Sequence, residues 1–89
     1  MSYRIEVSPA AQKELKFLPG YVRSQALQLI DLLAENPKPV RAKELREKRN
    51  LYRIWLSKNW RIVYELDDEL KVILIMRVRH KEQIDYPSL

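Results

Sequence analysis

The fold of this chain is decided by two neighbouring segments, Leu51-Tyr52-Arg53-Ile54-Trp55-Leu56 and, three residues later, Trp60-Arg61-Ile62-Val63-Tyr64. Both alternate at the strand period of two, so each places large apolar side chains on one face and an arginine on the other. The connection over 57–59 holds an odd number of residues, which lets both apolar faces reach the same core. The two segments are predicted to pair as a β-hairpin, with Asn59 in the left-handed conformation that a three-residue loop uses.

This register predicts that cations gather on the outer face of the hairpin. Arg61 is expected opposite Trp55, and Arg53 opposite Val63. An outward tryptophan can stack on a nucleobase or contact a protein partner, and both uses stay open.

The remaining patterns predict a strand over 3–7, helices over 9–18 and 21–35, and a third long strand over 71–78. Ser8 followed by Pro9 is typical of an N-cap and a first helical residue. The order βααβββ predicts a single α+β domain over 1–89, with a helical hairpin packed on one face of an antiparallel sheet.

Strict alternation along the third strand brings more arginines to the outer face. It predicts Val72, Leu74, Met76 and Val78 toward the helices, and Ile73, Ile75, Arg77 and Arg79 outward beside Arg53 and Arg61. The planar guanidinium binds phosphate through two parallel hydrogen bonds, so this surface favours a phosphodiester ligand. The alternative is the ordinary polar outer face of a sheet that is covered on one side only.

Composition narrows the chemistry that such a surface could support. The 89 residues carry 17 Lys and Arg against 12 Asp and Glu, a formal net charge of +5, which is typical of proteins that bind nucleic acid or an acidic partner. With no cysteine, one histidine and one glycine, thiolate metal sites and glycine-rich phosphate loops are excluded. Any catalysis is expected to need no metal and no cofactor. No apolar run is long enough to span a membrane, and a cytoplasmic location is expected.

Ribonuclease chemistry needs a group that takes the proton of the 2′-hydroxyl and groups that stabilise the phosphorane. His80 and Tyr86 are the candidate proton carriers, and the arginines are the candidate stabilisers. A tyrosine base needs its pKa, ordinarily about 10, lowered by neighbouring cations. The alternatives are that His80 is a loop residue without a role and that Tyr86 packs the C-terminus on the sheet.

Several segments together resemble the RelE/ParE superfamily of bacterial and archaeal type II toxins over essentially the whole chain. They are Ser-Pro-Ala-Ala-Gln-Lys-Glu-Leu from Ser8, Asn36-Pro37, Leu51-Tyr52-Arg53-Ile54, Trp60-Arg61-Ile62-Val63-Tyr64, and Arg79-His80-Lys81-Glu82 with Tyr86 downstream. The resemblance implies the RelE-like, microbial-RNase-type toxin fold and a cognate antitoxin that wraps the toxin.

The resemblance also implies roles for single residues. Arg61 matches the arginine that contacts the scissile phosphate, Arg53 matches a basic strand residue, and Tyr86 matches the proposed general base. His80 stands where relatives carry a basic residue or a histidine, whereas Trp55 stands where some RelE toxins carry a catalytic lysine. The expected catalytic residues are Arg61, Tyr86, Arg53 and His80, and the expected RNA- or phosphate-binding residues are Arg77, Arg79, Lys58, Lys81 and Trp55.

The function implied by the RelE branch is an endoribonuclease that enters the ribosomal A site and cuts mRNA by attack of the 2′-hydroxyl on the adjacent phosphate. One alternative is a ParE-like poison that inhibits DNA gyrase by binding. Another is a degenerate toxin that acts only in a complex with its antitoxin. The combination of Arg53, Arg61, His80 and Tyr86 favours the first.

Overall fold

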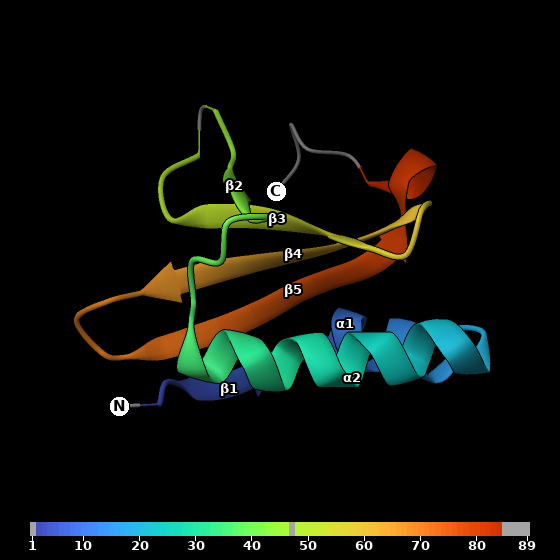
Figure 1. Cartoon of the computed structure of the whole chain (residues 1–89), viewed down its shortest axis with the longest axis horizontal. Helices are drawn as coiled ribbons and strands as arrows, with labels where there is room; N and C mark the ends of the chain where they lie inside the picture. The colour runs from blue at the N-terminus through green and yellow to red at the C-terminus, as the bar shows by residue number, and fades with distance from the viewer. Residues whose placement is uncertain (1, 47, 85–89) are drawn as a thin grey trace.

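The computed structural model describes residues 2–46 and 48–84, which form one sheet with two helices on one of its faces (Figure 1). The elements follow the chain as β1 (Arg4–Val7), α1 (Pro9–Lys16), α2 (Gly20–Glu35), β2 (Lys43–Glu44), β3 (Leu51–Leu56), β4 (Trp60–Asp67), β5 (Val72–His80) and the short 3₁₀ helix η1 (Lys81–Gln83). The predicted α+β class, two-helix pair and three long strands are confirmed.

The sheet has five strands in the order β1-β5-β4-β3-β2. The pairs β2–β3, β3–β4 and β4–β5 are antiparallel, but β1 runs parallel to β5, so the sheet is mixed and not wholly antiparallel as expected. The chain between β1 and β5 runs through both helices and then through β2, β3 and β4, and a connection of this length allows the two strands to lie parallel. The two-residue strand β2 lies between α2 and β3, where no element was predicted, because a charged stretch this short carries no strand pattern.

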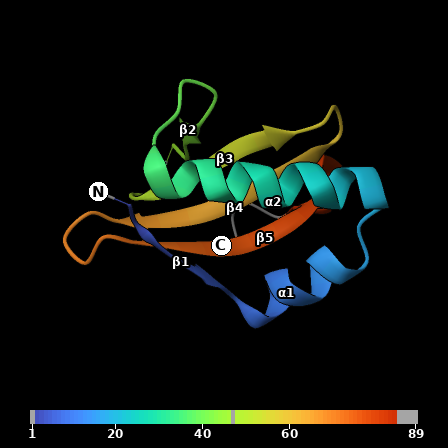
Figure 2. The same ribbon diagram turned by 60° about the horizontal axis from the view of Figure 1, so that its bottom comes forward.

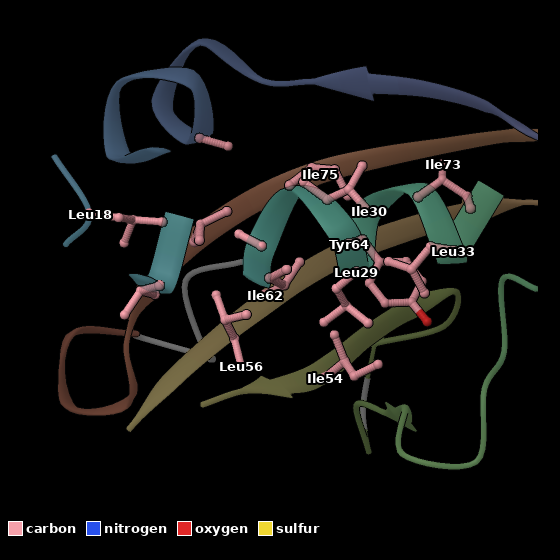
Figure 3. Packing of buried hydrophobic residues seen from close by; sticks show 14 of the residues in the cluster. Leu18, Leu29, Ile30, Leu33, Ile54, Leu56, Ile62, Tyr64, Ile73 and Ile75 are labelled. Carbon is pink, nitrogen blue, oxygen red and sulfur yellow. The ribbon is translucent and has the colours of Figure 1, made fainter. Parts of the chain in front are cut away.

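The core lies between the helices and the sheet. The buried side of α2, with Leu29, Ile30 and Leu33 among others, packs on inward side chains of β3, β4 and β5 such as Ile54 and Ile62 (Figures 2 and 3). Since both helices take the same face, the opposite face of the sheet is left for other contacts.

Helix α1 begins as its sequence predicts. The hydroxyl oxygen of Ser8 accepts a hydrogen bond from the backbone N–H of Ala11 at 3.0 Å, with Pro9 in the first helical turn. The same hydroxyl donates to the carbonyl of Met76 in β5 at 3.0 Å. One side chain therefore caps the helix and attaches it to the sheet.

The register of the β3–β4 hairpin is the predicted one. Trp55 pairs with Arg61 and Arg53 with Val63, across a three-residue loop. The loop conformation was predicted wrongly, because Ser57, with φ 56°, is its left-handed residue and Asn59 is not.

The strict alternation predicted for β5 is wrong in its first half. Val63 pairs with Arg77, but the next residue, Tyr64, pairs with Ile75, so Met76 is an extra residue and forms a β-bulge. A bulge reverses which face later side chains take. Ile73 and Ile75 therefore lie in the core with no exposed surface, and Val78 lies there too, while Leu74 and Met76 are only half-buried.

Candidate functional site

Two rows of paired residues cross the outer face of the sheet near the β3–β4 turn. The first row is Trp55–Arg61–Arg79, and the second is Arg53–Val63–Arg77, each with one residue from β3, β4 and β5. The bulge at Met76 makes this arrangement possible, because it returns Arg77 and Arg79 to the outer face after Ile73 and Ile75 have faced the core. The predicted gathering of four arginines on one face is thus present. Val63 and Trp55 lie among these arginines, whereas Ile73 and Ile75, which were also predicted on this face, do not.

Arg61 is the most enclosed of these arginines, with 7% of its surface exposed. Its guanidinium carbon lies 4.5 Å from the centre of the Trp55 ring, and its Nη1 donates to the carbonyl of Trp60 at 2.8 Å. A second contact, at 3.5 Å, reaches the carbonyl of Lys58. Arg61 lies on the outer face, as predicted, but it is buried there, because the hairpin turn and the indole hold this cation in place.

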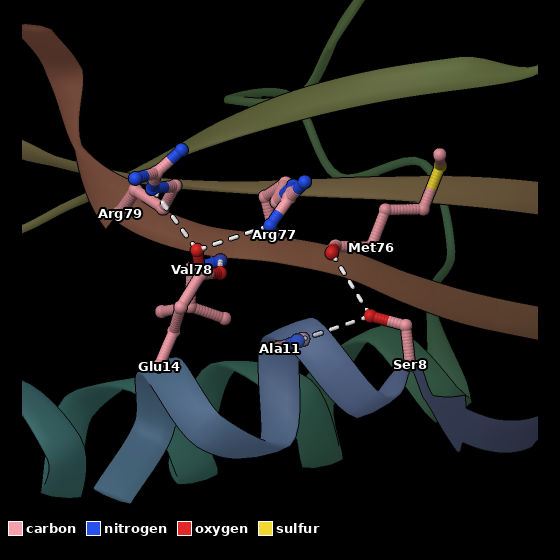
Figure 4. A network of polar contacts seen from close by, with 7 residues as sticks. All are labelled: Ser8, Ala11, Glu14, Met76, Arg77, Val78 and Arg79. Atoms are coloured by element: carbon pink, nitrogen blue, oxygen red, sulfur yellow. Dashed lines mark hydrogen bonds and ion pairs between the residues drawn. The ribbon is translucent and has the colours of Figure 1, made fainter. Parts of the chain in front are cut away.

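Arg77 and Arg79 share one carboxylate, that of Glu14 on α1 (Figure 4). The Oε2 atom of Glu14 lies 3.0 Å from Nε of Arg79 and 3.4 Å from Nη1 of Arg77. Its Oε1 atom accepts the backbone N–H of Val78 at 2.9 Å. The carboxylate is therefore fixed by the backbone of β5 between the two arginines.

Glu14 was not singled out from the sequence, although a signal was present. It lies three residues after Ala11 and four before Leu18, two residues of the buried core, so it shares the inward side of its helix. A carboxylate on that side needs hydrogen-bond or cationic partners, and this sequence is rich in arginine.

The remaining predicted phosphate ligands surround the arginine rows. Trp55 is 53% exposed although Arg61 lies against its ring. Lys58 is exposed in the β3–β4 turn. Lys81 is exposed in η1, and its backbone N–H donates to the carbonyl of Asn59 at 2.7 Å, which holds η1 against that turn.

His80 is not brought together with the arginines. It pairs with Trp60 in the ladder, and the two rings meet edge-on with centroids 5.5 Å apart. Neighbouring side chains of a strand point to opposite faces, so His80 takes the face opposite to Arg79. Its Nδ1 accepts the backbone N–H of Glu82 at 3.3 Å and caps η1. Tyr86, the candidate base, lies outside the described residues.

A shallow cavity of about 290 Å³ opens beside Arg79, where α1 meets the end of β5. Its lining combines apolar and aromatic side chains, among them Trp60 and Phe17, with the polar groups of Lys13 and Gln83. Phe17 is 78% exposed. Arg79 therefore stands between a surface of cations and a hollow with aromatic walls, a combination that suits a nucleotide's charged phosphate and its flat base.

In the described part of the chain, no helix is long and apolar enough to cross a membrane. Within the same residues, no three His, Asp or Glu side chains are grouped so that they could hold a metal ion.

Comparison with known proteins gives a consistent result. A model of the family described as the ParE toxin of the type II toxin-antitoxin system parDE matches residues 5–85. The chain is similar to one in the archaeal RelE-RelB complex from Pyrococcus horikoshii OT3, at 26% identity and TM-score 0.81 over 94% of this chain and 100% of that one.

Two further structures come from E. coli. A mutant of the toxin RelE in the free state is 29% identical, with TM-score 0.84 over 99% of this chain and 93% of that one. A chain of the intact RelBE toxin-antitoxin complex is 30% identical, with TM-score 0.79 over 89% and 96%. No curated protein is similar enough to match this chain.

Proposed function

We propose that this chain, which belongs to the family of ParE toxins of type II toxin-antitoxin systems within the RelE/ParE superfamily, is a ribosome-dependent mRNA endoribonuclease. Family membership shows that the chain is a toxin of a type II toxin-antitoxin system. The cleavage reaction and its mRNA target are what we propose. RelE structures from an archaeon and from E. coli are among those that it resembles at 26–30% identity, which supports the RelE reaction over other toxin mechanisms.

The observation that carries the proposal is the pair of arginine rows on the outer face. Arg61 and Arg79 are direct cross-strand neighbours, and Arg53 and Arg77 flank Val63 in the next row. Guanidinium groups converging on one patch stabilise the charge that develops on a pentavalent phosphorane. Trp55 and the aromatic hollow beside Arg79 offer rings on which bases of a single strand could stack.

The proposed step is attack of a 2′-oxygen on the adjacent phosphorus, which breaks the bond to the 5′-oxygen of the next nucleotide. The products are a 2′,3′-cyclic phosphate and a 5′-hydroxyl: the base takes the proton of the 2′-hydroxyl, and a water molecule supplies the proton that the leaving 5′-oxygen gains. Arg61 and Arg53 stabilise the phosphorane, and Arg79 and Arg77 bind the scissile phosphate. Tyr86 takes the proton of the 2′-hydroxyl. His80 faces Trp60 and is left out of the step.

The partners that follow are the ribosomal A site with its mRNA and a cognate antitoxin. One of the similar structures is the E. coli RelBE toxin-antitoxin complex and another is the archaeal RelE-RelB complex, which supports the second partner. Lys58 and Lys81, exposed at the arginine end of the sheet, add positive charge for contact with ribosomal RNA.

The test is a bacterial cell-free translation reaction in which mRNA ends are mapped by primer extension, with a parallel tube that lacks ribosomes. We expect discrete cuts only with ribosomes, and a loss of cutting of at least about tenfold in Arg79→Ala. The matched control is Arg4→Ala, which removes the same charge from an exposed residue on β1 paired with Glu6. Equal cutting by Arg79→Ala and Arg4→Ala would contradict the assignment of the arginine surface.

The second candidate function is inhibition of DNA gyrase by binding, because the matching family model is described by the ParE toxin. Uncut mRNA together with loss of supercoiling in a purified gyrase reaction would replace the first proposal by this one. If mRNA stays intact and gyrase stays active, the third reading remains, a toxin that acts only within its antitoxin complex.

A further inference from the structure

Glu14 makes three contacts to β5 that fall into two kinds. Its Oε1 atom accepts the backbone N–H of Val78 at 2.9 Å, a contact that serves the fold. Its Oε2 atom pairs with Nε of Arg79 at 3.0 Å and, more loosely, with Nη1 of Arg77 at 3.4 Å, contacts that depend on its charge (Figure 4).

The N–H of Val78 needs such a partner because the parallel partner of β5 has ended by then. The pairing with β1 stops at Val7 opposite Ile75, and beyond it α1 covers the edge of β5. The Glu14 side chain is 18% exposed, so water competes weakly for its oxygens. The carboxylate is thus anchored on the strand whose arginines it contacts, and it cannot move away without breaking the bond to Val78.

We propose that Glu14 is a positioning residue that holds Arg79, and to a lesser degree Arg77, in the orientation that binds the scissile phosphate. A guanidinium held through Nε still has the edge formed by its two terminal nitrogens to offer, and that edge binds a phosphate through two hydrogen bonds. The Arg79 side chain is more than one third exposed, so without a partner it would lose much rotamer freedom when it binds RNA. Because Glu14 already holds it, this entropy loss does not weaken RNA binding.

The expected effect of Glu14 on cleavage rests on the proposed function, whereas its contacts with Arg79 and Arg77 do not. The informative change is Glu14→Gln. A glutamine oxygen can still accept the N–H of Val78, so the fold is kept, whereas its amide has no charge to hold Arg79. Glu6→Gln is the matched control, because Glu6 pairs with Arg4 at 2.9 Å on the exposed side of β1, away from the arginine rows.

The first measurement needs no activity: the NMR signal of the Arg79 Nε–H group. We expect it to shift and to exchange faster with water in Glu14→Gln, and to stay unchanged in Glu6→Gln. An unchanged signal in Glu14→Gln would overturn the claim that Glu14 holds Arg79, whatever the protein does to mRNA.

The second measurement is a double-mutant cycle on ribosome-dependent cleavage with Glu14→Gln, Arg79→Ala and the combined variant. We expect Glu14→Gln to slow cleavage about tenfold and to add less than about twofold once Arg79 is gone, because residues in contact are not additive. Effects that multiply would mean that Glu14 acts through the fold alone, and would overturn the proposal.

Arg79→Lys tests the same idea without touching Glu14, in case Glu14→Gln does not fold. A lysine keeps the charge but cannot be held at one nitrogen while offering a fork to phosphate, so we expect a loss similar to that of Glu14→Gln. Full activity of Arg79→Lys would overturn the proposal. A wild-type protein that cuts no mRNA would instead remove the proposed function, and the Arg79 signal would then decide alone whether Glu14 holds the arginine.

Discussion

The hydroxyl of Tyr64 is a polar group inside an otherwise apolar core. The side chain is fully buried and stacks on Tyr52 with ring centroids 5.5 Å apart. Its hydroxyl donates to the carbonyl of Pro37 at 2.7 Å, so it links the end of the helical half of the chain to β4. A buried hydrogen bond of this kind stabilises modestly when made and costs more when one partner is left alone.

We expect Tyr64→Phe to lower the free energy of unfolding by about 1 kcal/mol at pH 7, because the Pro37 carbonyl loses its donor. The measurement is urea unfolding followed by circular dichroism. Tyr21→Phe is the control, since Tyr21 is 65% exposed and should change stability by less than about 0.5 kcal/mol. Equal stability of the wild type and Tyr64→Phe would show that the bond to Pro37 contributes nothing.

The same residue gives a prediction in alkali. Burial raises the pKa of Tyr64 above its ordinary value of 10, with a smaller contribution from the nearby Tyr52. Because the folded protein keeps this proton longer than the unfolded chain, the stabilisation is complete below pH 10 and is lost as pH rises beyond it, by up to about 1.4 kcal/mol per pH unit.

Phenylalanine has no such proton. The stability gap between wild type and Tyr64→Phe should therefore shrink between pH 9 and pH 11, as measured by urea unfolding at each pH. A gap that is the same at both values would mean that the pKa of Tyr64 is not raised in the fold.

At the scale of elements, α1 replaces a strand along the second half of β5. The backbone N–H of Ser8 donates to the carbonyl of Ile75, its hydroxyl donates to that of Met76, and Glu14 accepts the N–H of Val78. An open sheet edge is thereby covered by a helix, which protects it from pairing with other chains. The same contacts set the distance between α1 and the arginines of β5.

We expect Ser8→Ala to lower the free energy of unfolding by about 1–2 kcal/mol, because one hydroxyl both caps α1 and bonds to β5. Denaturant midpoints at constant m-value provide the measurement. Ser24→Ala, at an exposed position inside α2, is the control and should be neutral. A loss no larger than that of Ser24→Ala would contradict the double role.

Comparison of β3, β4 and β5 shows where sequence patterns are sufficient. In β3 and β4 apolar and polar residues alternate, so the register and the faces of Arg53 and Arg61 could be predicted. The first half of β5 is apolar throughout, and a run such as Val-Ile-Leu-Ile-Met carries no signal of which residues face inward. The bulge at Met76 depends on pairing with β4 and could not be read from β5 alone.

In the candidate site, too, some features follow from the sequence pattern and others depend on packing. The arginines follow from strand period, because Arg77 and Arg79 flank the inward residue Val78 beyond the bulge and therefore both point outward. The position of His80 follows from the same rule and argues against its predicted role, since it lies one residue beyond Arg79. Glu14 acts across more than sixty residues of sequence, and only the packing of α1 on β5 brings it to the site.

The whole molecule has a separation of charge along its sheet. The β3–β4 turn, next to Arg61, Arg79, Lys58 and Lys81, lies at one end, and the β4–β5 turn lies at the other (Figure 1). That second turn holds Asp68 and Glu69 with Lys71, Asp68 pairs with Lys38 at 3.6 Å, and the turn adjoins a hollow whose charged lining residues, Glu65, Asp67, Asp68 and Glu69, are all acidic. A molecule with net charge +5 and this separation is expected to approach polyanions with its arginine end first.

This arrangement predicts how binding to purified ribosomes depends on salt. Each phosphate that a cation neutralises contributes about 0.7–0.9 to the slope of log affinity against log salt. Arg79→Ala should therefore reduce the slope by about that amount, whereas Arg4→Ala should leave it near the wild-type value although it removes the same charge. The measurement is ribosome affinity at several KCl concentrations. Equal slopes for the two variants would place the ribosome contact elsewhere, because net charge alone would then explain the salt dependence and the arginine end would have no special part in docking.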